Sequence, residues 1–246
     1  MIGLFLVRNL LQYTINKSKT MKRLKFTIFA TLFLSLFLLN SCQSDSGDTA
    51  QASSGDYWPT AVGNQWILDQ SGQSVSMKII SSENDYFKFD QFSGMGQGVT
   101  GSASVYLKKV KGDYSIKIDE LKFNYGEGIT GKSSGYEFIF FKDYLDVNKT
   151  WTGNFVQETS FSIAEFPTIK MNVSYTGIIL EKASSAIVNG VTYNDVIKFK
   201  FHQEVKIEGQ PSTASDAEYW LAKDIGVIKF TAGDVVSVLK SYVVKK

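Results

Sequence analysis

Hydrophobic and polar side chains alternate with a period of two along the chain from residue 57 to its end. Val75, Met77 and Ile79, for example, are separated by serine and lysine residues. Successive side chains of a β-strand point to opposite faces, so this alternation predicts half-buried strands. The same alternation recurs in the ranges 87–89, 116–118, 121–125, 169–175, 197–201, 219–222, 227–230 and 235–244. No window of a dozen residues keeps a helical period with capping residues. The sequence therefore predicts an all-β meander of about ten antiparallel strands.

Turn-forming pairs separate these alternating ranges. Asn189-Gly190 has apolar residues on both sides and tolerates the positive φ angles of a tight hairpin. Alternation with one polar face favours a single curved antiparallel sheet, a half-barrel or an open barrel, that turns its aromatic face inward. A sandwich of two sheets is the alternative. We expect one all-β domain over residues 57–246.

Two short segments of this domain resemble each other. Residues 62–66 (Val-Gly-Asn-Gln-Trp) and 147–151 (Val-Asn-Lys-Thr-Trp) each place a turn-forming pair after valine and end in tryptophan. Five residues are too few to establish an internal duplication. We expect both tryptophans to hold the start of a strand against the core.

The first 41 residues have the pattern of an export leader. A basic stretch at residues 22–25 is followed by 14 residues, 26–39, that are apolar apart from threonine and serine. As a helix this run spans about 21 Å, less than the roughly 30 Å hydrocarbon core of a bilayer. This favours a signal peptide over a transmembrane anchor. Because a complete signal begins at Met21, we expect translation to start there and residues 1–20 to be dispensable.

Residues 39–42, Leu-Asn-Ser-Cys, resemble the lipobox of bacterial lipoproteins, which usually reads leucine, a small residue, glycine, alanine or serine, and then cysteine. Asn40 departs from the commonest choice, whereas Leu39, Ser41 and Cys42 fit. The resemblance implies that the leader is removed before Cys42 and that this cysteine carries the lipid anchor, palmitate included. An ordinary signal peptide followed by an incidental cysteine is the alternative.

The residues between Cys42 and the domain are small, polar and acidic. They show no apolar periodicity, so residues 42–56 are expected to form a flexible tether. Gln43 follows the cysteine, whereas aspartate at this position commonly marks retention in the inner membrane. We therefore expect a cell-envelope protein anchored by lipid in the outer membrane, on either its periplasmic or its cell-surface face.

Charge and composition exclude several classes of partner. The formal net charge is +2, but the leader holds six basic residues and no acidic one, which leaves 20 Lys+Arg, 24 Asp+Glu and a net charge of −4 after it. Both arginines lie in the leader, and an acidic domain without arginine is a poor candidate for nucleic-acid binding. A single cysteine and a single histidine exclude an internal disulfide and a zinc site made of several such residues.

Three segments together resemble a broad group of uncharacterised bacterial envelope lipoproteins. They are residues 57–66 (YWPTAVGNQW), 187–196 (IVNGVTYNDV) and 219–229 (YWLAKDIGVIK), about 30 residues in total. The usual signature of this group is an opening Y-x-P-x-x-x-G-x-x-W and a closing Y-W-x-A-K-x-x-G-x-V-K. The resemblance implies a curved antiparallel sheet like that of periplasmic lipoprotein carriers, which hold acyl chains. It implies no catalytic residue.

Residues 126–133 match the phosphate-loop pattern G-x-x-x-x-G-K-S letter for letter. Such a loop needs a buried strand before it and a helix after it, so that backbone N–H groups and Lys132 can bind phosphate. The ranges 121–125 and 136–141 instead have the character of strands. We interpret the motif as a glycine-rich hairpin loop that matches by chance, with a nucleotide-binding enzyme as the alternative. Residues 96–101 match the dinucleotide pattern G-x-G-x-x-G, and a strand-like run follows them too.

No pattern in the chain identifies a catalytic, cofactor-binding or metal-binding residue. His202 neighbours apolar Phe201 in an alternating strand, so it is expected on the polar face as a surface histidine. Nothing selects a particular pair of carboxylates as acid and base. We therefore expect no enzymatic activity.

The aromatic residues are the remaining candidates for a functional role. They exceed what one sheet face needs, so they form either the core or the lining of an apolar cavity for an acyl chain. The candidates are Phe138, Phe140, Phe141, Phe199, Phe201, Tyr219 and Trp220. The sequence thus favours a non-enzymatic envelope lipoprotein that binds a lipid-like ligand or part of another envelope protein. The alternative is a surface-exposed interaction or structural module without a small-molecule ligand.

Replacing Cys42 with serine tests the anchor. The hydroxyl cannot form the thioether to lipid, so Cys42→Ser is expected to abolish incorporation of radiolabelled palmitate and to remove the protein from the outer-membrane fraction. Ser41→Ala keeps a residue that the lipobox allows and should leave both measurements unchanged. Unaltered labelling of the Cys42→Ser protein would contradict the assignment.

Overall fold

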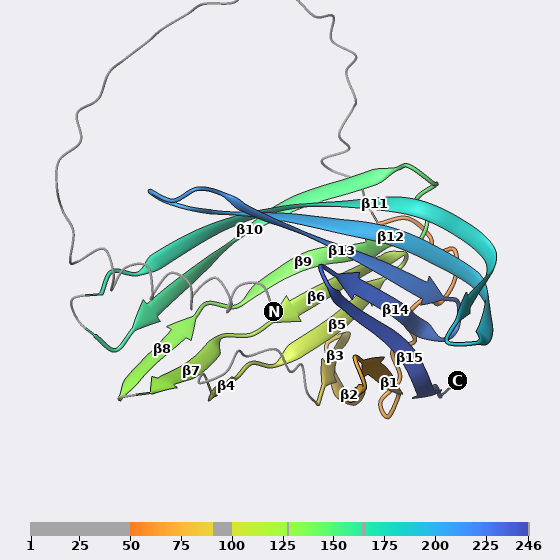
Figure 1. Ribbon diagram of the computed structural model, residues 1–246, viewed down its shortest axis with the longest axis horizontal. Coiled ribbons are helices and arrows are strands. Elements are labelled where there is room, and N and C mark those ends of the chain that lie inside the picture. The colour runs from red at the N-terminus through yellow and green to blue at the C-terminus, as the bar shows by residue number, and fades with distance from the viewer. Residues whose placement is uncertain (1–49, 91–99, 127, 164–165, 246) are drawn as a thin grey trace, which may run out of the picture.

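The computed structural model describes residues 50–90, 100–126, 128–163 and 166–245, and every regular element in them is a β-strand. The fifteen strands of the described residues form one antiparallel sheet (Figure 1). They are β1 (Gln65–Gln70), β2 (Gln73–Glu83), β3 (Tyr86–Phe89), β4 (Thr100–Ser102), β5 (Val105–Val110), β6 (Asp113–Ile118), β7 (Leu121–Gly126), β8 (Ile129–Ser133), β9 (Tyr136–Lys142), β10 (Thr150–Phe161), β11 (Ile169–Val188), β12 (Val191–Ile207), β13 (Thr213–Ala222), β14 (Gly226–Ala232) and β15 (Val235–Val243). No described segment is a helix that could cross a membrane.

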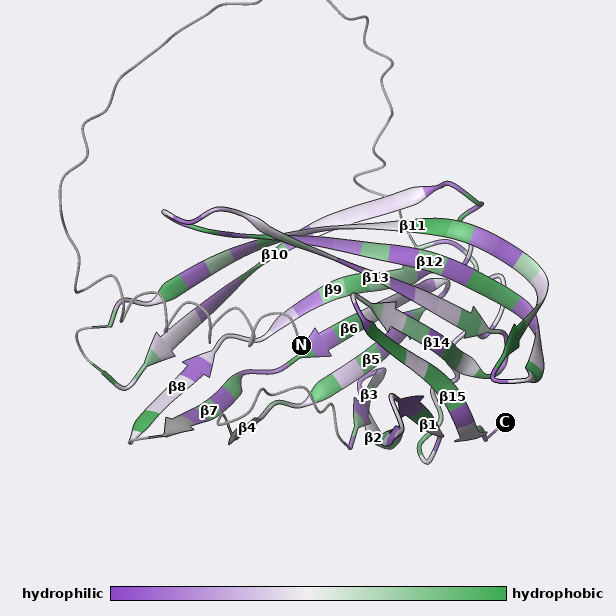
Figure 2. Cartoon of the chain, in the orientation of Figure 1, coloured by the Kyte–Doolittle hydropathy of each residue, from purple (hydrophilic) through white to green (hydrophobic). Residues whose placement is uncertain are grey.

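The sheet is curved and open, as the sequence predicts. Its order is β4-β7-β8-β10-β11-β12-β13-β14-β15-β1-β2-β3-β5-β6-β9, so β4 and β9 are the two edges. The long strands β10 to β13 arch over β5, β6 and β9 (Figure 1). Apolar and polar bands follow one another along β11 and β12 (Figure 2), which is the period-two pattern of a sheet with one buried face. The two-sheet sandwich is not formed.

The predicted number of strands, about ten, is too low. One reason is that residues 103–104, 119–120 and 134–135 each interrupt an extended run, so β4 and β5, β6 and β7, and β8 and β9 are separate strands. A second reason is β10, whose inward-facing positions include the polar Gln157 and Thr159. Polar residues on the inner face conceal the alternation on which the prediction depends.

The three interrupted runs leave a gap in hydrogen bonding between β9 and β10. One strand of each run lies on one side of this gap: β4 pairs with β7, β7 with β8, and β8 with the far end of β10, where Ser133 lies opposite Thr159. The other strand of each run lies on the other side: β3 pairs with β5, β5 with β6, and β6 with β9. Strand β9 therefore lies next to β10 without a backbone ladder to it. We call this junction the seam.

The concave face of the sheet holds one large aromatic core. Its fully buried members include Trp66, Tyr114, Phe141 and Phe199. Phe141 and Phe199 stack with their ring centroids 4.8 Å apart. A smaller buried cluster of Met171, Val173 and Val205 lies further along β11 and β12. The predicted aromatic interior is thus present and largely filled by its own side chains.

The two similar sequence segments adopt the same hydrogen-bonded turn. Gly63 and Asn148 both have positive φ, and their N–H groups donate to the carbonyl oxygens of Ile79 and Ile179, both at 2.8 Å. The ladders of Ile79 with Phe89 and of Ile179 with Phe199 each shift register at the next residue. Trp66 and Trp151 follow these turns and are buried. The prediction that both tryptophans fix strand starts against the core is confirmed. The two segments resemble each other in backbone conformation as well as in sequence.

The residues just before the domain bind to it. Cys42 and most of the expected tether lie outside the described residues, but residues 51–56 are held by hydrogen bonds. Buried Asp143 accepts from the hydroxyl of Ser53 at 2.5 Å and from the N–H of Ser54 at 2.9 Å. The N–H of Asp224 donates to the carbonyl of Asp56 at 2.6 Å. We call residues 51–56 the docked segment.

Candidate functional site

Side chains replace the missing ladder at the seam. The N–H of Ile139 in β9 donates to the hydroxyl oxygen of Tyr175 in β11 at 3.2 Å. The carbonyl oxygen of the same residue accepts from the indole nitrogen of Trp151 in β10, also at 3.2 Å. A buried, unpaired peptide group is costly, and these two bonds satisfy both polar groups of Ile139. At Ile139, two aromatic side chains therefore take the place of a neighbouring strand on the edge of β9.

Two glycines make these bonds sterically feasible. Trp151 lies opposite Gly177, and Tyr175 lies opposite Gly153, in the ladder of β10 with β11. A Cβ atom on Gly177 would overlap the indole of Trp151, and one on Gly153 would overlap the phenol of Tyr175. Each ring thus lies over the backbone of the neighbouring strand and reaches β9.

Five aromatic rings gather beside these bonds. Tyr136 of β9 stacks on Phe155 of β10, with centroids 4.2 Å apart and planes within 3°. Phe138 lies 5.7 Å from Phe155 and 5.6 Å from Phe201, which stacks with Tyr175 at 5.3 Å. We call Tyr136, Phe138, Phe155, Tyr175 and Phe201 the seam cluster. It continues the large core up to the seam and adjoins the smaller cluster through Phe155.

The seam cluster is apolar and partly accessible. Tyr175 and Phe201 are buried, whereas Tyr136, Phe138 and Phe155 keep part of their surface exposed. Burial raises the pKa of Tyr136 to about 12. Burial also raises the pKa of Tyr175, and the hydrogen bond from Ile139 opposes part of that rise. Both phenols are therefore neutral at physiological pH, and the cluster presents an uncharged surface suited to hydrocarbon.

The outer face of the same strands carries an open depression of about 320 Å³. Its lining consists of the outward-facing residues Asn154, Val156, Asn172, Ser174, Glu204 and Lys206, together with parts of Phe155 and Val173. The outward-facing residues alternate with Phe155 and Val173, so the depression opens on the face opposite the seam cluster. Because it opens on the outer face and includes the charged Glu204 and Lys206, it is not the inner apolar cavity that the sequence suggests.

The aromatic candidates divide between the core, the seam and the outer face. Phe140, Phe141, Phe199 and Tyr219 pack in the core, and Phe138 and Phe201 lie in the seam cluster. Trp220 instead lies on the outer face between the ammonium groups of Lys198 and Lys229, at 4.2 and 4.5 Å from its ring centre. It lines no apolar cavity, because its neighbour Tyr219 occupies the inward position.

The phosphate-loop match forms a hairpin. Strand β7 ends at Gly126, strand β8 begins at Ile129, and no helix follows. Lys132 is exposed and lies 3.8 Å from Glu120, and the Ser133 hydroxyl is buried 2.7 Å from that of Thr159. The hairpin interpretation is confirmed. Of the dinucleotide-like match, residues 96–99 lie outside the described residues and Gly101 belongs to β4.

His202 lies on the outer face, as predicted. Its side chain is 46% exposed, and its Nδ1 lies 2.7 Å from a carboxylate oxygen of Asp216. Hydrogen bonds from Lys200 and His202 lower the pKa of Asp216. Within the described residues no group of three His, Cys, Asp or Glu is placed to bind a metal ion.

Sequence reasoning missed the residues that define the seam. Trp151 was expected only to fix a strand, and Phe155, Tyr175 and the two glycines were not singled out. The signal was present, because aromatic–glycine pairs such as Trp151 with Gly177 recur across β10 and β11. These pairs can be recognised only when the register of the two strands is known.

Comparisons with known proteins give no family. No family model matches the chain, and no curated protein matches it. A crystal structure from Parabacteroides distasonis ATCC 8503, provisionally described as that of a lipoprotein, aligns with a TM-score of 0.44 at 9% identity over 78% of this chain and 100% of that one. A likeness at this score supports no assignment.

Replacing Gly177 with alanine tests the seam. The added methyl group overlaps Trp151, so Gly177→Ala is expected to lower the free energy of unfolding by about 1–3 kcal/mol in urea titrations. Trp151→Leu in the same chain removes the ring that would clash. The loss from Gly177→Ala should then be smaller than in the wild-type background, whereas additive losses would contradict the arrangement.

Alkaline pH tests the environment of Tyr136. The unfolded chain loses this phenolic proton near pH 10, whereas the folded protein keeps it to about pH 12. The stabilisation is complete below pH 10 and is lost as the pH rises to 12, by up to about 1.4 kcal/mol per pH unit from this residue. Tyr136→Phe should therefore flatten the decline measured by urea titration between pH 8 and 11. Identical slopes in the two proteins would show that Tyr136 is not buried in this way.

Proposed function

We propose that this chain is a non-enzymatic lipoprotein of the cell envelope, held in the outer membrane through Cys42, whose seam cluster binds the hydrocarbon chain of a lipid-like ligand. The sequence supports the anchor, through the leader and the lipobox. The partly exposed, uncharged rings at a junction without a ladder support the ligand site. This junction is the single observation that carries the proposal.

The seam is the part of the sheet that opens at least cost. Parting β9 from β10 near Ile139 breaks two side-chain hydrogen bonds, each worth about 1 kcal/mol net. Parting two paired strands would break a backbone bond at every second residue on each strand. A hydrocarbon chain that enters between Tyr136 and Phe155 gains about 0.8 kcal/mol for each buried methylene group, so a few such groups offset the cost.

The alternative, an interaction module without a ligand, has an observation of its own. On the outer face of β3 and β5, the rings of Tyr86 and Tyr106 lie 6.2 Å apart. The ammonium group of Lys117 lies 5.1 Å from the first ring and 5.3 Å from the second. Tyrosine is enriched at protein interfaces, so this exposed pair is a candidate contact for a partner. If the protein functions by binding a partner at these tyrosines, the seam cluster binds no ligand and only stabilises the fold.

Native mass spectrometry of protein purified from membranes in detergent distinguishes the two functions. We expect wild-type protein to carry a non-covalent lipid and Phe155→Asp to lose it, because a carboxylate in the stack repels hydrocarbon. Val156→Asp is the matched control, since Val156 is the next residue, is 43% exposed and lies on the outer face.

Thermal melting of all three proteins checks that they are folded. If wild-type protein carries no lipid, the proposed ligand site is wrong and the interaction module is the favoured function. Equal lipid occupancy in wild-type protein and Phe155→Asp would place the ligand elsewhere.

A further inference from the structure

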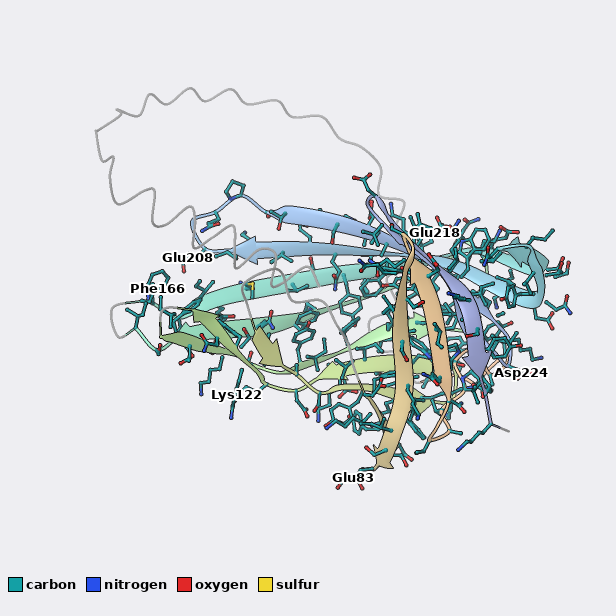
Figure 3. The ribbon with its side chains drawn as sticks, turned by 60° about the horizontal axis from the view of Figure 1, so that its bottom comes forward. Glu83, Lys122, Phe166, Glu208, Glu218 and Asp224 are labelled. Atoms are coloured by element: carbon teal, nitrogen blue, oxygen red, sulfur yellow. The ribbon has the colours of Figure 1, made fainter. Side chains whose placement is uncertain are left out.

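The docked segment fixes which end of the domain lies near Cys42. It binds the turn at residues 111–112, where the N–H of Gly112 donates to the carbonyl of Gln51 at 2.9 Å. It also binds Asp143, at the end of β9, and Asp224, in the turn between β13 and β14. These turns lie at one end of the long axis, and we call it the anchor end. In Figure 3, Asp224 lies toward this end, and Phe166 and Glu208 lie at the opposite one.

The chain between Cys42 and the docked segment is short. Nine residue steps separate Cys42 from Gln51. Even fully extended, they span at most about 30 Å. A lipid on Cys42 therefore keeps the anchor end within this distance of the bilayer surface, whereas the opposite end has no such constraint.

A hairpin projects from the anchor end. Strands β11 and β12 continue past Ile179 and bend to their turn at Asn189-Gly190 (Figure 1). The base of this hairpin binds the same residue as the docked segment does. The ammonium group of Lys182 donates to the carbonyl oxygen of Asp143 at 3.1 Å. Five residue steps of strand lead from Lys182 to Ile187, a reach of about 17 Å.

The tip of the hairpin exposes aliphatic side chains. Ile187 is 70% exposed and Val191 is 51% exposed, on either side of the turn. Val62 and Val147, in the two repeated turns of the anchor end, are each 42% exposed. Exposed isoleucine and valine at a loop tip have no role in the core, and they suit the boundary between lipid headgroups and acyl chains.

The exposed positive and negative charges at the anchor end nearly balance. An anionic membrane surface therefore neither strongly attracts nor strongly repels this end. The exposed lysines are Lys111, Lys149, Lys182, Lys223 and Lys245, and the exposed carboxylates are Asp146, Glu181, Asp195 and Asp224. Contact with a membrane would therefore depend on the aliphatic tip and vary little with salt.

We propose that the anchor end faces the bilayer and that Ile187 and Val191 insert into its headgroup region; this rests on the lipidation of Cys42 in the proposed function. The occupant is a lipid surface because the short tether holds one beside the hairpin at high effective concentration. The turns at Phe166 and Glu208 then point away from the membrane.

Fluorescent labelling tests the orientation in full-length lipidated protein. The lipid occupies Cys42, the chain's single cysteine, so Ile187→Cys or Glu208→Cys supplies one thiol for an environment-sensitive nitrobenzoxadiazole dye. The proteins are reconstituted into vesicles of phosphatidylethanolamine and phosphatidylglycerol. We expect emission at position 187 to rise at least twofold over detergent-free buffer and to be quenched by spin-labelled lipid, with neither change at position 208. Val191→Cys should behave as Ile187→Cys does.

Two failures are distinguishable in the same sample. Intact mass spectrometry reports whether Cys42 carries lipid. The dye at position 187 of a lipidated protein could stay in water, or it could be shielded by a protein contact and remain insensitive to spin-labelled lipid. Either result overturns the orientation and leaves the anchor intact. A protein without lipid overturns the anchor and the orientation together.

Discussion

The architecture depends on how the β9 edge of the sheet is satisfied. A strand edge exposes N–H and carbonyl groups that invite another strand. Here Trp151 and Tyr175 bond to both groups of Ile139, and Gly177 and Gly153 give them the room to do so. The sheet can therefore curve back upon itself without closing as a ladder. At this junction, hydrogen bonds with side chains replace those of a backbone ladder. The aromatic interior, the accessible rings of the seam cluster and the apolar character of that cluster all follow from this replacement.

The repeated turn at Gly63 and Asn148 places this edge in a wider pattern. Each turn begins a run of strands, and each run ends near the start of the other. Strand β15 meets β1 with a full ladder, whereas β9 meets β10 with side chains alone. The two junctions are thus chemically different although the turns beside them are alike. Local opening is expected where a strand has few backbone hydrogen bonds, which makes the β9 junction the weaker of the two.

Much of the fold could be predicted from the sequence, because alternation in ranges such as 169–175 and 197–201 reports burial directly. Register could not be predicted. The pairing of Trp151 with Gly177 depends on which residues of two long strands lie opposite each other, and many offsets preserve the inward face. Polar residues in β10 conceal its alternation, so only its start at Trp151 is predicted. The docked segment reads as a linker because serine and glycine dominate it, and its acceptor, Asp143, lies 90 residues from Ser53.

The docked segment also determines how the domain would respond to tension. A pull on the N-terminal residues reaches the carbonyl of Gln51 first, which accepts from Gly112, and then the hydrogen bonds on Asp143. The N–H of Tyr57, which donates to the Tyr114 hydroxyl, and the buried side chain of Trp58 come next. Only after these yield does the load reach β1. Force is thereby spread over turns that join several strands, and β1 is protected from being pulled out of the sheet between β15 and β2. The domain gains resistance to a pull on its N-terminal chain in this way without any covalent cross-link.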